Sequence, residues 1–173
     1  EYVDVLDRQS QRLKKLIDDL TEASKASTGN VKIELGPCDA GVMMTQVMGE
    51  YQEKAENADL RLMLDIPDSS VIIMADGRQL WRILNNLMDN ICKYSMPGTR
   101  VYQKLKTDGD KAVISYRNIS KYELNISPDE LTERFVRGDS SRHTEGSGLG
   151  LSIAQNLTEL QNGGFSIDID GDL

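Results

Sequence analysis

The chain has 173 residues, of which 39% are hydrophobic and 28% charged, as is typical of one globular domain with its own core and a short additional element. Twenty-eight acidic residues against twenty basic ones give a net charge of -8, so a broad nucleic-acid-binding surface is not expected. The sequence has no apolar run of about 18 residues, no signal-peptide pattern and only two cysteines, Cys38 and Cys92, so we expect a soluble piece with reduced thiols.

Residues 2–24 place apolar or small residues at alternating steps of three and four. These seam positions are Val3, Leu6, Ser10, Leu13, Ile17, Leu20 and Ser24. Such an a/d pattern predicts an amphipathic helix, which alone is marginal in water and must pack on its own domain or on other helices. The small residues and glycine of 26–30 then predict a linker.

Short elements alternate irregularly from residue 31 to residue 116. We predict strands at 31–35, 60–66 and 71–74, a turn at 37–41 and a helix at 42–58. Two further strands at 99–106 and 112–116 flank Thr107-Asp108-Gly109-Asp110, whose Asp-Gly pair predicts a hairpin turn. The fold class is therefore α+β, a two-layer α/β sandwich with one mixed sheet covered by helices on one face.

The helix predicted at 80–95 carries two faces, with Asp76 as a plausible N-cap and Pro97-Gly98 at its end. Its apolar stripe, expected to pack on the sheet, comprises Leu80, Ile83, Leu84, Leu87 and Ile91. A second stripe consists of Asn86, Asn90 and Lys93, spaced i, i+4, i+7, with Tyr94 beside it. Asp89 lies a full step round the helix and is not assigned to this stripe.

Repeated asparagine within an apolar helix requires an explanation, because its side chain competes for backbone hydrogen bonds. One interpretation is an exposed polar flank. The other is a site in which amide oxygens hold a hard cation such as Mg²⁺ together with the phosphates of a nucleotide. In that case Lys93 supplies positive charge and Tyr94 a flat face for a base. The helix alone does not decide between them.

A long irregular interval, residues 117–145, precedes a glycine cluster, and so long a loop is usually functional or disordered. Within it, Ser127-Pro128-Asp129-Glu130 predicts the start of a short helix that runs to Phe135. Four bases fall near the cluster: Lys121, Arg134, Arg137 and Arg142. The cluster, Gly-Ser-Gly-Leu-Gly-Leu at 146–151, opens a predicted helix at 152–161, where free N–H groups can meet phosphate. Gly163-Gly164 predicts a turn before a last strand at 165–169.

Asn-Leu-x-x-Asn-x-x-Lys-Tyr-Ser at 86–95 followed by Gly-x-Gly-Leu-Gly-Leu at 146–151 resembles the catalytic, ATP-binding domain of bacterial sensor histidine kinases. This domain belongs to the superfamily shared with gyrase, mismatch-repair ATPases and heat-shock chaperones. The resemblance covers residues 31–173 and implies the Bergerat ATP-binding fold with a lid at about 118–147. It also implies that residues 1–25 are the second helix of a dimerisation hairpin, which forms a four-helix bundle with a second chain, and that 26–30 are a linker.

The resemblance implies roles for single residues. Asn90 would ligate Mg²⁺, Asn86 would lie beside the phosphates, Lys93 would reach phosphate or ribose oxygens, and Tyr94 would stack near the adenine. Arg137, in Phe135-Val136-Arg137, would meet the γ-phosphate when the lid closes, with Arg142 as a helper. Gly146, Gly148 and Gly150 would hinge the lid and hold the triphosphate, and Leu149 and Leu151 would anchor the turn. The implied catalytic residues are Asn86, Asn90, Lys93 and Arg137.

The chain departs from the family after the strand that ends near Tyr116. There the family has Asp-x-Gly-x-Gly, whose aspartate accepts a hydrogen bond from the adenine amino group. This sequence has Asn118-Ile-Ser-Lys-Tyr, which keeps an acceptor oxygen but loses the charge and both glycines. Charge-assisted hydrogen bonds are about twice as strong as neutral ones, so the resemblance implies adenine binding weakened by on the order of 1 kcal/mol.

Hydrolytic relatives carry a glutamate general base at the position of Asn86, which cannot take a proton. This favours transfer of the γ-phosphate to a supplied nucleophile over hydrolysis. In the family the acceptor is a histidine on the first hairpin helix, expected before Glu1, whereas His143 reads as an exposed loop residue. The implied partners are ATP, the hairpin of a homodimer and a response regulator, with no nucleic acid. The implied location is the cytoplasmic side of a membrane-anchored parent.

Two other functions stay open from the sequence. One is a nucleotide-binding signalling module without kinase activity, which the replacement at Asn118 makes credible. The other is a structural dimerisation protein in which the asparagine stripe is a solvated flank.

Overall fold

The computed structural model describes residues 2–27, 31–122, 124, 127–133 and 149–170. The helices are α1 Tyr2–Ser27, α2 Ala40–Asn57, α3 Gly77–Tyr94, α4 Pro128–Glu133 and α5 Gly150–Glu159. The strands are β1 Gly36–Asp39, β2 Leu60–Asp65, β3 Ile72–Ala75, β4 Thr99–Asp108 and β5 Lys111–Arg117. None of the helices in these ranges combines the length and apolar character needed to cross a membrane.

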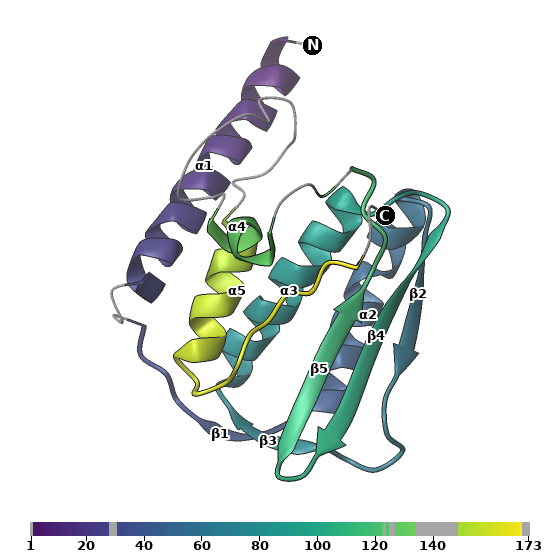
Figure 1. The fold of residues 1–173 in the computed structure, drawn as a ribbon. Coiled ribbons are helices and arrows are strands. Elements are labelled where there is room, and N and C mark those ends of the chain that lie inside the picture. Colours follow the sequence, from purple (N-terminus) through teal and green to yellow (C-terminus); the bar gives the residue numbers. More distant parts are fainter. Residues whose placement is uncertain (1, 28–30, 123, 125–126, 134–148, 171–173) are drawn as a thin grey trace.

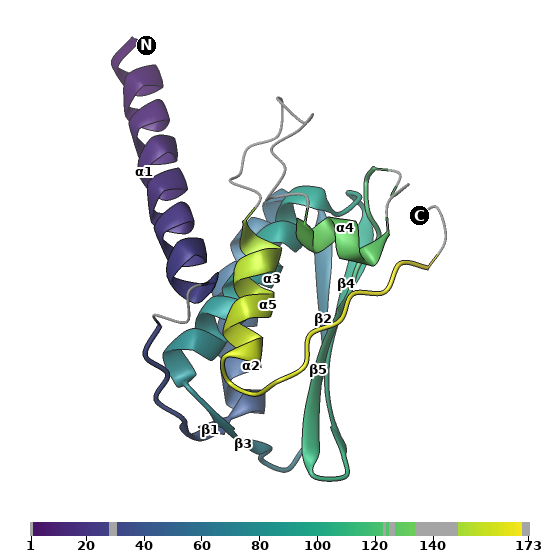
Figure 2. The same cartoon turned by 60° about the vertical axis from the view of Figure 1, so that its left-hand side comes forward.

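A mixed sheet in the order β2-β4-β5 forms one layer of the domain. β2 runs parallel to β4, and β4 pairs antiparallel with β5. Helices α2, α3 and α5 lie on one face of this sheet (Figures 1 and 2). The predicted α+β sandwich is confirmed. The prediction of a single sheet is wrong for the described residues, because β1 and β3 pair with each other as a separate two-stranded sheet.

Two predicted strands are misplaced. The strand expected at 31–35 lies at β1, where a turn was expected, because Pro37 is tolerated in a strand that pairs on one side only. The carboxylate of Asp39 then accepts the backbone N–H groups of Gly41 and Val42, so α2 begins at Ala40. The strand expected at 165–169 alternates half-buried and exposed residues, yet residues 163–170 form no strand. An alternating pattern of apolar and polar residues predicts which side chains are buried, but it does not show that the backbone pairs with another strand.

Turns and caps follow the predictions more closely. The β4–β5 hairpin turns through Gly109 and Asp110, and Gly109 has a φ of 61°, which glycine adopts without strain. Ser127 and Glu130 exchange side-chain-to-backbone hydrogen bonds of 3.0 and 3.3 Å, the capping box that starts α4. After α5, the N–H of Gly163 donates to the carbonyl of Thr158, as in a Schellman motif. Short-range sequence signals therefore fix these local structures.

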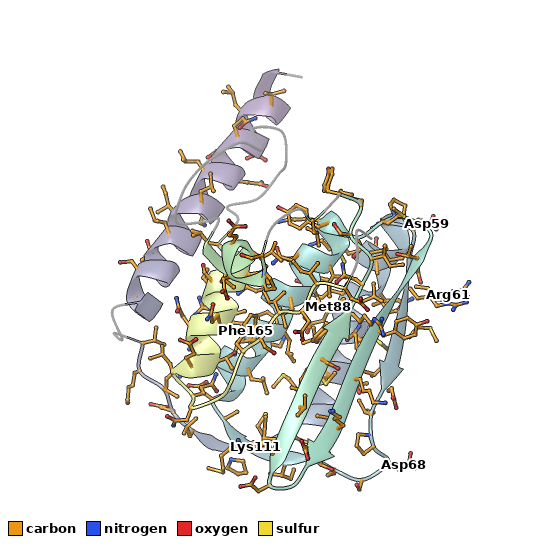
Figure 3. The ribbon with its side chains drawn as sticks, viewed as in Figure 1. Asp59, Arg61, Asp68, Met88, Lys111 and Phe165 are labelled. Atoms are coloured by element: carbon orange, nitrogen blue, oxygen red, sulfur yellow. The ribbon has the colours of Figure 1, made fainter. Side chains whose placement is uncertain are left out.

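The core has two parts. The larger part lies between the sheet and helices α2 and α3, and Figure 3 shows Met88 near its centre. Its fully buried large side chains include Met44, Val47, Leu84, Met88 and Val101. A smaller cluster of Ile83, Ile153, Ala154 and Leu157 joins α3 to α5. α3 is therefore packed on two sides, which fixes its place between the sheet and α5.

The seam of α1 does not pack on the domain. Its apolar members Val3, Leu6, Leu13, Ile17 and Leu20 are between 56% and 75% exposed. Packing of this seam on its own domain, one of the two options from the sequence, is therefore wrong. α1 ends at Ser27, inside the predicted linker, and residues 28–30 lie outside the described residues.

Two polar side chains of the sheet, Gln103 and Tyr116, place buried polar atoms in the core. Gln103 and Tyr116 are cross-strand partners on β4 and β5, and Gln103 is fully buried. Both amide atoms of Gln103 and the Tyr116 hydroxyl are buried without a hydrogen-bond partner in the described structure. Burial raises the pKa of the Tyr116 phenol, so its proton is retained. Unpaired buried polar atoms destabilise a fold.

We predict that Gln103→Met raises the free energy of unfolding by about 1–2 kcal/mol, because it replaces an unpaired amide by an apolar chain of similar length. Urea unfolding followed by circular dichroism measures the change. Gln52→Met, at an exposed position of α2, is the matched control and should change stability by less than about 0.5 kcal/mol. A loss of stability in Gln103→Met would show that the amide is paired in solution.

Asp76 joins three segments at one end of the helical layer. Its carboxylate accepts the backbone N–H groups of Arg78 and Gln79 at 3.0 and 3.2 Å, which caps α3 as predicted, and that of Glu34 at 3.0 Å. Its own N–H donates to Oε1 of Gln161, after α5, at 2.7 Å. The N–H groups that it accepts, that of Glu34 first, lower the pKa of this buried carboxyl.

We expect Asp76→Asn to lower the free energy of unfolding by about 1–2 kcal/mol at neutral pH, since one amide oxygen cannot accept all three N–H groups. The folded-state pKa lies below the reference value of 3.8, so the carboxylate's contribution is complete above about pH 5 and is lost as the pH falls through the folded-state pKa. The difference in stability between wild type and variant should therefore narrow in urea titrations below about pH 4. If the free energies of unfolding of wild type and variant differ by the same amount down to about pH 2, the charged carboxylate of Asp76 is not the source of the stabilisation. Asp68→Asn, in the exposed turn before β3 (Figure 3), is the charge-matched control.

Candidate functional site

The predicted asparagine stripe lies at the edge of the buried face of α3. Of the apolar stripe, Leu80, Ile83, Leu84 and Ile91 are buried, and Leu87 is half-buried against the α5 cluster. Asn86, Asn90, Lys93 and Tyr94 are all half-buried. The interpretation as a solvated flank therefore does not hold for this stripe.

The glycine motif meets the asparagine stripe at Gly150, the first residue of α5. A Cβ atom placed on Gly150 would lie 3.5 Å from Oδ1 of Asn86, 3.5 Å from Nδ2 of Asn90 and 3.6 Å from its Oδ1. Two motifs about sixty residues apart thus converge in contact. Leu149 packs on the α5 cluster, and Leu151 is half-buried. Gly146, Gly148, Arg137 and Arg142 lie outside the described residues, so their roles stay predictions.

Two features of this contact suit an anion or a metal-bound anion. Nδ2 of Asn90 is buried and has no hydrogen-bond partner in the described structure. The N-terminus of α5 lies at the same place, and a helix N-terminus carries partial positive charge. The described residues contain no cluster of three or more histidine, cysteine or acidic side chains that could hold a metal. A metal here would depend on the neutral amides and on its ligand's own oxygens.

Asn118 lies at the other end of the stripe. Its Nδ2 donates to Oγ of Ser95, the C-cap of α3, at 2.9 Å. The segment after Asn118 is also bonded to the end of α3, because the N–H of Lys121 donates to the carbonyl of Tyr94 at 2.9 Å. From Asn86 to Tyr94 the helix rises about 12 Å, a length that a nucleoside triphosphate can span. The start of the predicted lid is thus held on the end of α3.

Sequence reasoning missed Ser95 as the partner of Asn118, and no periodicity marks it. It also gave no role to Asp89, which the structure places away from the stripe, against α2. There Asp89 Oδ1 lies 3.0 Å from the Tyr51 hydroxyl and pairs with Lys54. The exclusion of Asp89 from the asparagine stripe agrees with this geometry.

The sequence profile of the histidine kinase-, DNA gyrase B- and HSP90-like ATPases matches residues 75–172, which include the asparagine stripe and the glycine motif. The chain belongs to this ATPase family.

Several known proteins align with most of this chain. The circadian input-output histidine kinase CikA of Synechococcus elongatus is 29% identical over 97% of this chain, which spans 23% of that protein. Full-length ShkA in complex with AMPPNP has a TM-score of 0.73 at 23% identity, covering 92% of this chain and 33% of ShkA. Histidine kinase ThkA in complex with the response regulator TrrA has a TM-score of 0.68 at 19% identity, covering 94% of this chain and 44% of ThkA. These structures share the fold.

We predict that Gly150→Ala preserves the fold and impairs nucleotide binding. Its methyl group would make ordinary contacts with both carboxamides, so the free energy of unfolding should change by less than about 1 kcal/mol. We expect the methyl group to occupy space that the phosphates need beside the two amides, so affinity for Mg·ADP should fall about tenfold in calorimetric titration, or by about 1.4 kcal/mol. Gly49→Ala, in α2 with nothing within 4 Å of the added atom, is the control. Equal affinities for Gly150→Ala and wild type would contradict the placement of the phosphates.

Proposed function

We propose that this chain is the ATP-binding catalytic part of a sensor histidine kinase, which transfers the γ-phosphate of ATP to a histidine on a dimerisation hairpin. The observation that carries the proposal is that Gly150 lies close to both Asn86 and Asn90, whose amide atoms are 3.5–3.6 Å from a Cβ atom placed on it. The membership in the ATPase family and the kinases among its relatives support it. The chain spans less than a quarter of CikA, so the activity of the whole protein is part of the proposal.

The residues present fit a magnesium-bound triphosphate. Mg²⁺ favours oxygen ligands and keeps most of its coordination for water and phosphate, so one amide oxygen from Asn90 suffices on the protein side. When bound, the ion would neutralise charge on the phosphates. Asn86 and the first N–H groups of α5 would orient the phosphates, and Tyr94 and Asn118 would border the base at the other end of the stripe.

The chemistry of Asn86 favours transfer over hydrolysis. An amide cannot accept a proton from water, so the site lacks a general base at the position that faces the phosphates. A neutral imidazole needs no such base to attack phosphorus, because its ring nitrogen already carries a lone pair. We propose Lys93 and Arg137, with Arg142, as the cations that stabilise charge on the transferred phosphoryl group.

The partners follow from the exposed surface of α1. Its seam is the kind of stripe that packs in a four-helix bundle, so we propose that α1 joins the acceptor hairpin of a homodimer. The acceptor histidine would lie on the other hairpin helix, outside this sequence. The complex of ThkA with TrrA supports a response regulator as the next recipient. We propose a parent anchored in the membrane with this part in the cytoplasm.

A second candidate is a nucleotide-binding module without kinase activity. It is favoured by Asn118, where the family has a charged aspartate. The amide of Asn118 donates to Ser95, which leaves its oxygen as an acceptor, so adenine recognition is retained in weaker form. A purely structural dimerisation protein is disfavoured, because the asparagine stripe is half-buried against Gly150.

The test is binding of a fluorescent ATP analogue with and without Mg²⁺. Asn90→Ala should weaken magnesium-dependent binding at least tenfold, because the protein ligand is lost, while Asn57→Ala at the exposed end of α2 should not. Phosphorylation of a hairpin supplied in trans, lost in Asn90→Ala, separates the kinase from the inactive module. Absence of magnesium-dependent binding in the wild type would refute both.

A further inference from the structure

α3 carries another polar stripe beside the asparagine stripe. Asn85, Asp89 and Cys92 are also spaced i, i+4, i+7, and each directly precedes a member of the stripe formed by Asn86, Asn90 and Lys93. Consecutive residues point about 100° apart on a helix, so the two stripes face different neighbours. The asparagine stripe lies toward Gly150 of α5, whereas the Asp89 side chain and the backbone carbonyl of Asn85 face α2. The side chain of Asn85 donates to the carbonyl of Trp81 within α3.

Two side chains of α2 hold this stripe. The hydroxyl of Tyr51 lies 3.0 Å from Oδ1 of Asp89 and 3.2 Å from the backbone carbonyl of Asn85. Lys54 pairs with the same oxygen of Asp89, and its ammonium lies 5.1 Å from the centre of the Tyr51 ring. Burial and the Asp89 carboxylate raise the pKa of the Tyr51 phenol, which therefore remains a donor. The contacts define one α2–α3 clamp, consisting of Tyr51, Lys54 and Asp89.

Apolar packing between α2 and α3 does not fix the rotation of α3 by itself. Hydrophobic attraction is non-directional, and the large buried side chains here include Met44 and Met88, whose flexible chains adapt to small shifts. Hydrogen bonds have narrow geometry. A turn of α3 by 20° about its axis would move the ends of the asparagine side chains by roughly 2 Å. Misplacement by about 1 Å is enough to impair a binding or catalytic constellation.

We propose that Tyr51 is a positioning residue for the nucleotide site, setting the rotation of α3 through Asp89 so that Asn86 and Asn90 face Gly150. Lys54 holds the Asp89 carboxylate in place for Tyr51. The inference rests on the proposed function, since it concerns the phosphate end of that site. Tyr51 itself touches neither the asparagine side chains nor Gly150 in the described contacts.

Tyr51→Phe tests the proposal, because it removes one hydroxyl and keeps the ring that packs on the core. Two ligands are titrated into wild type and variant: Mg·ADP by calorimetry, and adenosine by chemical shifts. Mg·ADP reports the phosphate end, and adenosine only the base end. We expect the dissociation constant for Mg·ADP to rise three- to tenfold and that for adenosine to stay within a factor of two.

Controls separate positioning from general destabilisation. Tyr102→Phe makes the same change at a tyrosine 46% exposed on the outer face of the sheet and should alter neither constant. Asp89→Asn keeps an acceptor for Tyr51 and loses the charge that pairs with Lys54, so it should give an intermediate loss for Mg·ADP. If Tyr51→Phe does not fold, this variant carries the test.

Two results would overturn the inference. Unchanged binding of Mg·ADP with a lowered melting temperature would show that the clamp only stabilises the domain. Equal weakening for both ligands would show a general loosening of the site. A wild type that binds adenosine but not Mg·ADP, or neither ligand, would instead refute the proposed function, and the inference with it.

Discussion

The site depends on one close approach: Gly150, the first residue of α5, lies beside the amides of Asn86 and Asn90 on α3. The cluster of Ile83, Ile153, Ala154 and Leu157 holds the two helices together nearby. The result is a helix N-terminus beside two neutral carboxamides. Such a surface suits an anion that brings its own metal ion.

Different sides of α3 contact different parts of the domain. The apolar stripe anchors the helix on the sheet, the asparagine stripe lies toward α5, and Asp89 bonds to Tyr51 and Lys54 of α2. Burial raises the pKa of the Cys92 thiol, in agreement with a reduced, packed cysteine. A further side of this 18-residue helix is exposed to solvent at Trp81.

Structures formed by residues close together in the sequence were predictable, whereas contacts between distant residues mostly were not. Asp76, the capping box of Ser127 and Glu130, and the Asp-Gly hairpin act over a few residues and were found correctly. The convergence of the asparagine and glycine motifs was predictable only through resemblance to a family, because nothing local relates residue 90 to residue 150. β1 was misplaced, since its strand character comes from pairing with β3, some 35 residues away, and Pro37 locally favours a turn. Tyr51 and Asp89 gave no signal, because which residues of two helices meet depends on packing of the whole layer.

Asp76 connects the start of α3 to the residues after α5 and to the segment before β1. α3 and α5 are antiparallel, with Asp76 bonded to Gln161 at one end and Gly150 against Asn90 at the other. The polypeptide arriving from α1 is fastened at the same place through Glu34. Asp76 thus bonds to the segment before β1 and to a residue after α5, while the cluster of Ile83, Ile153, Ala154 and Leu157 joins the two helices between their ends. Replacing Asp76 would therefore affect the attachment of three segments at once.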